Sequence, residues 1–141
     1  MNRADSCDWL IAYSQMVLEI TSALHGYDSL ENALRSSLDK TVEFIGAEAG
    51  ITWYYHKNGD NRIYPSYWVG SADPTGMSLA YGEGIAGKVI KNGKPIGVNN
   101  CQNDRHCVIR FCNSTGFVAK SMICVPLISK QNVIGCIQLI N

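Results

Sequence analysis

Apolar residues recur at helical spacing in two stretches near the N-terminus. From about residue 8 to residue 24, alternating three- and four-residue steps connect one set of side chains: Leu10, Tyr13, Val17, Ile20 and Leu24. This seam predicts an amphipathic helix that packs against its own domain, against a second subunit, or against both. A second helix is predicted from Leu30 to about Ala47, with an acidic N-cap at Asp28 and Glu31 three residues on.

Aromatic and β-branched residues dominate after residue 50 and predict two hairpins. The segments ITWYYHK at 51–57 and RIYPSYWVG at 62–70 flank the turn sequence NGDN. Pro65 lacks the amide hydrogen that a ladder needs, so its strand is expected at an edge or at a bulge. The segments AKSMICVPLIS and VIGCIQLIN, separated by KQN, predict the second hairpin near the C-terminus.

The segment between the hairpins predicts shorter elements. Short strands are expected at MSLAY and PIGV, a helix from about Ile85 to Asn92, and a small helix near Val108 to Asn113. Because hairpins dominate this order, the chain is predicted to be an α+β domain with a mainly antiparallel sheet and helices packed against it.

Composition limits the partners and the location. The 141 residues carry 12 Lys+Arg and 12 Asp+Glu, so no net positive field attracts nucleic acid or an anionic membrane surface. No apolar run reaches the ~20 residues of a membrane span, and the N-terminus lacks the apolar core of a signal peptide. A cytoplasmic protein with reduced cysteines is therefore expected.

The stretch YGEGIAGKV contains the spacing G-x-G-x-x-G, which occurs in dinucleotide-binding and kinase phosphate loops. Neither HRD nor DFG occurs in the chain, and the flanking hairpins do not form the parallel βαβ unit of a dinucleotide fold. The stretch instead predicts a tight turn and a helix start. Its free amides at Ile85, Ala86 and Gly87 become an anion site only if a ligand occupies a neighbouring pocket.

Four motifs in sequence order connect the chain to a known family: GEGIAGKVIKNGKPIGVNN, NDRH, STGFVAKSMICVPL and VIGCIQLIN. Over residues 27–141 they resemble a GAF domain, the small-molecule sensor module of cyclic-nucleotide phosphodiesterases, adenylyl cyclases, phytochromes and many bacterial signalling proteins. The resemblance implies a central antiparallel sheet of about six strands with helices on both faces. It also implies that residues 1–26 form a dimerisation helix, and that a closing helix and an output domain lie downstream in a longer bacterial protein.

The resemblance places a ligand pocket between the sheet and the segments at 81–119. Matched positions imply one set of ligand-binding residues: Trp68, Ile85, Ala86, Val108, Cys112, Thr115, Phe117 and Gln138. Four positions lack the aromatic hydroxyl, acid, threonine and glutamate of the cyclic-nucleotide-binding members: Val108, Cys112, Ala119 and Gln138. Because missing polar partners weaken discrimination, a smaller or more apolar ligand, or none, is favoured over a cyclic nucleotide.

Three other functions are open from the residues. A metal or an iron-sulfur cluster would use the soft ligands Cys101, His106, Cys107, Cys112 and Cys124, but their spacing lacks a C-x2-C knuckle and favours packed thiols. A bilin chromophore needs a cysteine followed by His or Tyr, a pair that this sequence lacks. Methionine sulfoxide reductases that resemble the chain place a cysteine in the glycine stretch, where Ile85-Ala86 stands here.

The sequence therefore predicts a non-catalytic regulatory domain without metal or cofactor. Its expected partners are a small molecule of unknown identity, a second copy of the chain in a homodimer, and a downstream output domain.

Overall fold

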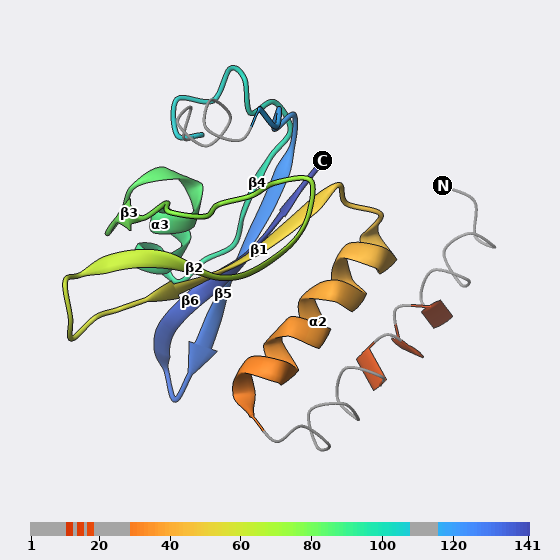
Figure 1. Cartoon of the computed structure of the whole chain (residues 1–141), viewed down its shortest axis with the longest axis horizontal. Helices are drawn as coiled ribbons and strands as arrows, with labels where there is room; N and C mark the ends of the chain where they lie inside the picture. Colours follow the sequence, from red (N-terminus) through yellow and green to blue (C-terminus); the bar gives the residue numbers. More distant parts are fainter. Residues whose placement is uncertain (1–10, 13, 16, 19–28, 108–115) are drawn as a thin grey trace.

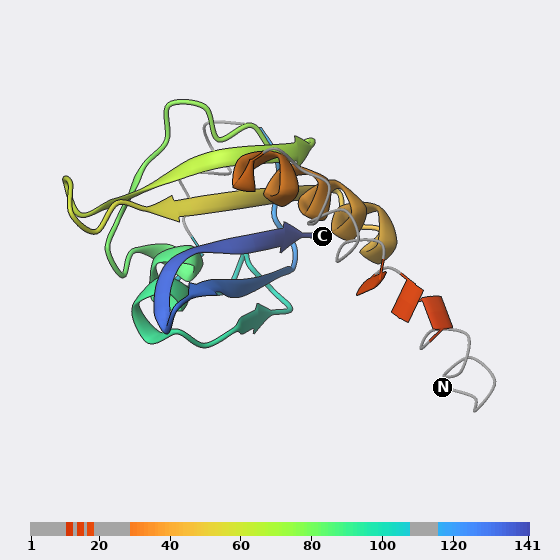
Figure 2. The same cartoon turned by 90° about the horizontal axis from the view of Figure 1, so that it is seen from below.

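The computed structural model describes residues 11, 12, 14, 15, 17, 18, 29–107 and 116–141. Its helices and strands are α2 (Leu30–Ile45), β1 (Ala49–Tyr55), β2 (Arg62–Gly70), β3 (Leu79–Ala80), α3 (Gly84–Asn92), β4 (Ile96–Val98), β5 (Met122–Ser129) and β6 (Asn132–Ile140). The described residues between 11 and 18 are helical and lie on the outer side of α2, away from the sheet (Figure 1, Figure 2). The small helix predicted near Val108, and the seam positions Leu10, Tyr13, Ile20 and Leu24, lie outside the described residues.

The strands form one six-stranded sheet in the order β3-β2-β1-β6-β5-β4. Every neighbouring pair is antiparallel, as the two predicted hairpins require. The pairing of β1 with β6 brings the first and last strands of the sheet side by side at its centre. The predicted α+β class with a central antiparallel sheet is therefore confirmed.

The two helices cover opposite faces of this sheet because successive strand residues point to opposite sides. On β1, Gly50 faces α2, where an added Cβ would overlap Leu38 and Val42. Ile51 and Trp53 face the other way and belong to the main hydrophobic cluster, which includes the buried side of α3. Figure 1 shows α2 beside β1 and β2, and α3 on the opposite side of the strands.

The ends of α2 follow the sequence signals with one change. The N-cap residue is Ser29, whose hydroxyl accepts a hydrogen bond from the Asn32 amide at 3.2 Å. The predicted N-cap residue was Asp28, which lies outside the described residues. Gly46 ends the helix in the left-handed region at φ 74°, and its amide donates to the Val42 carbonyl at 2.9 Å.

Pro65 lies beside a bulge and beyond the end of the edge strand. The register of β1 and β2 shifts between Thr52 and Trp53, and Pro65 is the partner of Trp53 next to this bulge. On its other side, β2 pairs with β3 at Arg62 and Ile63, so the pairing ends before Pro65. The ladder therefore tolerates a residue without an amide hydrogen at this position, as both expectations for Pro65 required.

Gly135 on β6 lies against β1 so closely that no side chain fits between the strands. A Cβ at this position would overlap the carbonyl oxygen of Trp53, whereas a Cβ at Gly97 on the edge strand β4 would meet no atom within 4 Å. We predict that Gly135→Ala destabilises the domain by about 1–3 kcal/mol, as overpacking does. Gly97→Ala is the matched control and is expected to leave stability unchanged or slightly raised.

Urea unfolding of both variants measures this difference as a shift of the midpoint. Equal midpoints for the two variants would contradict the close approach of β6 to β1.

Candidate functional site

The glycine stretch forms the turn that leads from β3 into α3. Gly82 and Gly84 have φ angles of 83° and 66°, in the left-handed region that side chains with a Cβ rarely adopt. A Cβ at Gly87 would approach the backbone carbon of Gly82 to 2.8 Å and the carbonyl oxygen of Ala80 to 3.2 Å. Each glycine of the G-x-G-x-x-G spacing thus has a conformational or packing reason to be glycine, without any phosphate.

The start of α3 carries a carboxylate. Glu83 is the N-cap residue, and its Oε2 accepts a hydrogen bond from the amide of Ala80 at 2.7 Å. The amide of Gly87 donates to the carbonyl of Glu83 at 3.0 Å, so the expectation that this amide is free was wrong. The negative charge of Glu83 offsets the positive end of the helix dipole and disfavours an anion beside Ile85 and Ala86.

A buried polar network lies under α3 on the same face of the sheet. The indole Nε1 of Trp53 donates to Oε1 of Gln138 at 2.7 Å, and Nε2 of Gln138 lies 3.0 Å from the sulfur of Met122. Trp53 is 2% exposed and Gln138 is 8% exposed. Because a thioether is a weak acceptor, the Gln138 amide keeps unused capacity to donate and accept hydrogen bonds.

Two buried thiols lie next to this network. Cys124 and Cys136 are on the α3 face of β5 and β6 and are free of disulfides. The hydrogen bond between Cys136 and the Cys124 side chain, followed by burial, raises the pKa of the Cys136 thiol far above its ordinary range. The Cys136 sulfur also lies 3.9 Å from the carbonyl oxygen of Ala86, which links β6 to α3. Burial makes both thiols poor nucleophiles, and the raised pKa of Cys136 adds to this.

The interior of the domain is uncharged. Among the described residues, Thr52 and Gln138 are the buried polar side chains, and neither carries a charge. Thr52 alternates with Ile51 and Trp53 and therefore lies on the α2 face. Gln138 is thus the polar side chain that the α3 face buries within the described part of the chain.

The soft-ligand cluster proposed from the sequence gains no support. Cys101 is buried and Cys107 is half-buried, and neither forms a disulfide. Within residues 29–107 and 116–141, no group of three or more His, Cys, Asp or Glu side chains is arranged to hold a metal ion. Cys112 lies outside the described residues.

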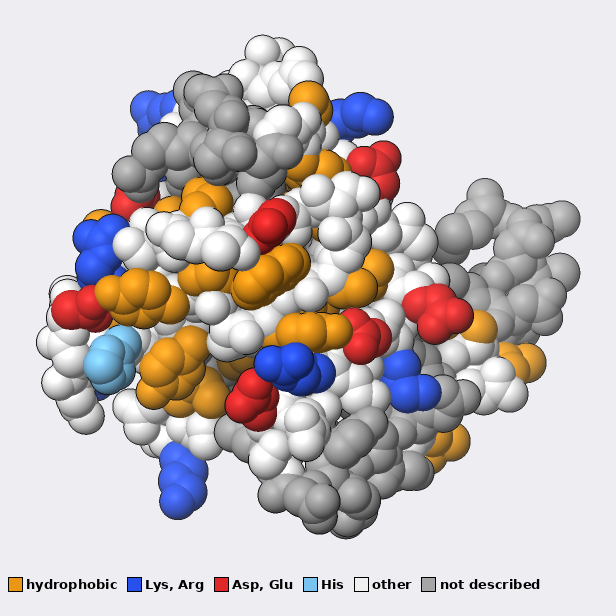
Figure 3. All heavy atoms as spheres, viewed as in Figure 1, with side chains coloured by type: hydrophobic (Ala, Val, Ile, Leu, Met, Phe, Trp, Pro, Cys, Tyr) orange, Lys and Arg blue, Asp and Glu red, His pale blue; other side chains and the backbone are white. Residues whose placement is uncertain are grey.

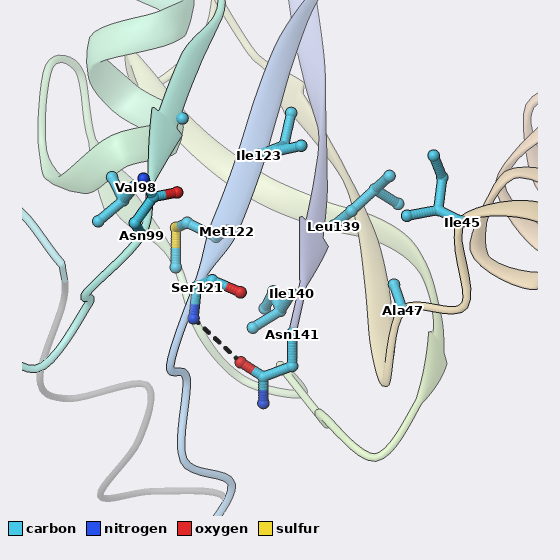
Figure 4. Close-up of a pocket in the computed structure, with 11 residues that line it drawn as sticks. Ile45, Ala47, Val98, Asn99, Ser121, Met122, Ile123, Leu139, Ile140 and Asn141 are labelled. Carbon is cyan, nitrogen blue, oxygen red and sulfur yellow. Dashed lines mark hydrogen bonds between the residues drawn. The ribbon is translucent and has the colours of Figure 1, made fainter. Parts of the chain in front are cut away.

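A groove of about 360 Å³ opens at the end of the sheet where α2 exits. Its apolar side chains include Ile45, Ile123 and Leu139, and its polar wall includes Ser121 and Asn141 (Figure 4). None of the eight residues implied as ligand-binding lines this groove. Met122 also lines the groove, so the groove adjoins the network under α3 at this side chain.

Charged side chains of both signs are interspersed on the molecular face shown in Figure 3. This mixture agrees with the equal numbers of acidic and basic residues in the chain. Among the described residues, no helix combines the length and the apolar character that a membrane span requires.

Comparison with known proteins identifies the family. The family model described as "GAF domain" matches residues 28–141. The chain belongs to the GAF domain family. GAF domains are regulatory sensor domains of signalling proteins, and this one follows their fold throughout the described sheet.

Two curated relatives contain a segment similar to this GAF domain. The dual 3',5'-cyclic-AMP and -GMP phosphodiesterase 11 of Drosophila melanogaster is 34% identical over 66 residues, which is 46% of this chain and 4% of that protein. The nitrogen fixation protein AnfA of Azotobacter vinelandii is 27% identical over 124 residues, which is 86% of this chain and 23% of that protein. The chain thus spans less than a quarter of either relative.

Two solved structures share the fold. The GAF domain of a phosphoenolpyruvate-protein phosphotransferase from Coxiella burnetii has a TM-score of 0.82 at 16% identity, covering 93% of this chain and 78% of that one. The free methionine-R-sulfoxide reductase from Neisseria meningitidis has a TM-score of 0.78 at 16% identity, covering 92% of this chain and 72% of that one. At these identities the likeness concerns the fold alone.

The GAF fold brings several of the predicted site residues together. Ile85, Ala86 and Phe117 belong to one buried cluster, Trp68 packs against it, and Gln138 bonds to its member Trp53. The remaining predicted site residues, Val108, Cys112 and Thr115, lie outside the described residues.

Trp53 and Met122, the partners of Gln138, were not among the residues predicted for the site. Alternation along AGITWYY places Trp53 on the same face as Ile51, which is a signal that the sequence does contain. The pairing with Gln138 also needs the register of β1 on β6, where Ile51 is opposite Gln138 and Trp53 is opposite Cys136. Strand alternation by itself does not specify that register.

The Trp53–Gln138 bond generates a stability prediction. Gln138→Leu leaves a buried indole N–H without its acceptor and is expected to cost about 1–3 kcal/mol in the free energy of unfolding. Trp53→Phe in the same background removes the orphaned donor, so the double variant should lose less than the sum of the single losses. Chemical denaturation of all four proteins measures this coupling, and strictly additive losses would contradict the bond.

Proposed function

We propose that this GAF domain is a regulatory sensor domain that binds a small, uncharged molecule between the sheet and α3. The observation that carries this proposal is the Trp53–Gln138 network. A buried amide with unused hydrogen-bonding capacity, surrounded by apolar side chains and thiols, favours a mainly apolar ligand with one polar edge. Trp68, Ile85, Ala86 and Phe117 would surround this ligand, together with Val108, Cys112 and Thr115.

The charges argue against a cyclic nucleotide as this ligand. A cyclic phosphate carries a negative charge, and Glu83 places another negative charge at the start of α3. Like charges at a helix N-terminus remove the attraction that the helix dipole provides. Gln138 also offers a neutral amide where the cyclic-nucleotide-binding members are expected to carry glutamate.

The thiols argue against catalysis by the domain. A reductase that uses cysteine needs a thiolate of low pKa that its substrate can reach. Cys124 and Cys136 are buried, and the pKa of Cys136 is raised. The glycine stretch holds Ile85 and Ala86, both buried, in place of a cysteine. We therefore propose that this domain senses a ligand and catalyses no reaction.

The proposal also includes association of two copies of the chain. Residues 1–26 would form a dimerisation helix and residues 27–141 the sensor domain, with an output domain elsewhere in a cytoplasmic signalling protein. Ile11 and Leu18 support this division, because they are 57% and 66% exposed on the described helical residues. Exposed large apolar side chains on a helix favour a partner helix.

Ligand binding is testable with two alanines of similar burial on opposite faces of the sheet. Ala86 on α3 is 2% exposed and Ala33 on α2 is 4% exposed. Alanine-to-valine substitution at either position is expected to cost about 1–3 kcal/mol by overpacking. Ala86→Val alone should also abolish binding, because its added methyl groups enter the proposed pocket.

Native mass spectrometry of each purified variant shows whether a small molecule accompanies the protein. Thermal-shift measurements then compare uncharged nucleobases and carboxamides with cyclic GMP and methionine sulfoxide. Stabilisation by an uncharged compound that Ala86→Val abolishes and Ala33→Val retains is the expected result. A shift with cyclic GMP alone, or turnover of methionine sulfoxide, would contradict the proposal.

Dimerisation gives a separate prediction at Val17, a seam position that is 39% exposed. We expect Val17→Glu to convert a dimer into a monomer, because a charge within an apolar helix contact is costly to bury. Gln15→Glu adds the same charge at an exposed polar position of the same helix and serves as the control. Sedimentation velocity distinguishes the dimer from the monomer. A Val17→Glu variant that remains a dimer would refute the role of the seam in dimerisation.

A further inference from the structure

The side chain of Asn141 joins two segments that are far apart in the sequence. Its Oδ1 accepts hydrogen bonds from the amides of Lys120 and Ser121, at 2.7 and 3.2 Å. Its Nδ2 donates to the carbonyl of Val118 at 3.0 Å and to Oε2 of Glu48 at 2.9 Å. An asparagine amide offers two donors and an acceptor oxygen with two lone pairs, and all of this capacity is used here.

One of these segments reaches into the core beside α3. Phe117 and Ala119 are buried in the main cluster, whereas Val118 and Lys120 alternate with them and are exposed. Asn141 therefore binds the backbone of a segment whose buried side chains, Phe117 and Ala119, would face the proposed ligand. Two backbone bonds add to this, from Asn141 to the Ser121 carbonyl at 3.0 Å and from Cys101 to the Lys120 carbonyl at 2.8 Å.

The other segment is the connection between α2 and β1. The backbone amide of Glu48 donates to the carbonyl of Ile140 at 3.1 Å, and the Glu48 carbonyl accepts from Ser71 at 3.1 Å. The Glu48 carboxylate then reaches Asn141. Glu48 thus ties the exit of α2 to the end of β6 through both its backbone and its side chain.

The backbone at Asn141 suits this residue type. Its φ angle is 67°, in the left-handed region where asparagine is enriched among residues with a side chain. The turn of the backbone points the amide toward the start of β5, as the dashed bond to Ser121 in Figure 4 shows.

We propose that Asn141 is a positioning residue that couples the segment Phe117–Ser121 to the end of β6 and to Glu48. The proposal rests on the proposed function in one respect, which is that a ligand under α3 contacts Phe117. A ligand that displaces Phe117 or Ala119 then strains the bonds of Asn141, and the displacement reaches β6 and the α2–β1 connection. Asn141 would thereby transmit the effect of ligand binding from the α3 face of the sheet to the α2 face.

A double-mutant cycle tests the coupling without any ligand. Phe117→Leu and Asn141→Ala are measured singly and together by denaturant unfolding, and Asn132→Ala replaces Asn141→Ala in the control cycle. Asn132 is a matched control because it begins the same strand and its Nδ2 donates to the Lys130 carbonyl at 3.2 Å. We expect non-additivity of about twofold or more in the unfolding equilibrium constant for Asn141, and additivity for Asn132. Additive effects in both cycles would overturn the proposal.

Hydrogen exchange distinguishes the bonds that Asn141 accepts from Lys120 and Ser121 from the bond that it donates to Glu48. Asn141→Asp keeps an acceptor for the amides of Lys120 and Ser121, so these amides should stay protected, whereas Asn141→Ala should expose them. The aspartate repels Glu48, and adding Glu48→Gln restores a hydrogen bond with the donor on the other side. We expect this double variant to regain stability that Asn141→Asp loses, and failure of the rescue would remove Glu48 from the coupling.

These outcomes are independent of the ligand experiments. Coupling between Phe117 and Asn141 in a protein that binds no uncharged compound would refute the proposed function and leave the positioning role intact. Ligand binding without coupling would refute the positioning role alone.

Discussion

The antiparallel pairing of β1 with β6 is the contact on which the rest of this GAF domain depends. It joins the first strand of the sheet to the last, and it unites the two hairpins that local sequence specifies separately. Because Gly135 has no side chain, β6 approaches the backbone of Trp53 closely. The same register carries Gln138 to the indole of Trp53, at 2.7 Å. The polar centre of the α3 face is thus a consequence of strand pairing.

The chemistry under α3 follows from what this pairing buries. An amide, an indole, a thioether and two buried thiols meet there, and no charged side chain of the described residues is buried among them. A neutral site of this kind discriminates by the shape and the hydrogen-bonding edge of a ligand and not by its charge. Glu83 has the same consequence, since it places a negative charge next to the start of α3, where phosphate-binding loops carry none.

Glycine spacing gives a clear example of a pattern with more than one physical origin. In a phosphate loop, glycines let the backbone approach the ligand. In this GAF domain, Gly82 and Gly84 permit left-handed backbone angles, and Gly87 lets α3 approach the preceding turn. The surrounding hairpins distinguish the two origins, and that context was already visible in the sequence. Pro65 is different, because the sequence allowed an edge or a bulge, and only the strand pairing showed that both apply: β3 ends before Pro65, and the bulge of β2 on β1 lies beside it.

Local patterns in the sequence determined α2, α3, the two hairpins and the family. Capping residues, turn residues and strand alternation act over a few neighbouring positions, so one chain is sufficient to recognise them. Tertiary structure alone decided which distant side chains meet. Gln138 was recognised as a site position, but its bond to Trp53 depends on register, and the four bonds of Asn141 depend on three segments converging. Such contacts arise from the packing of the whole sheet, which no local pattern encodes.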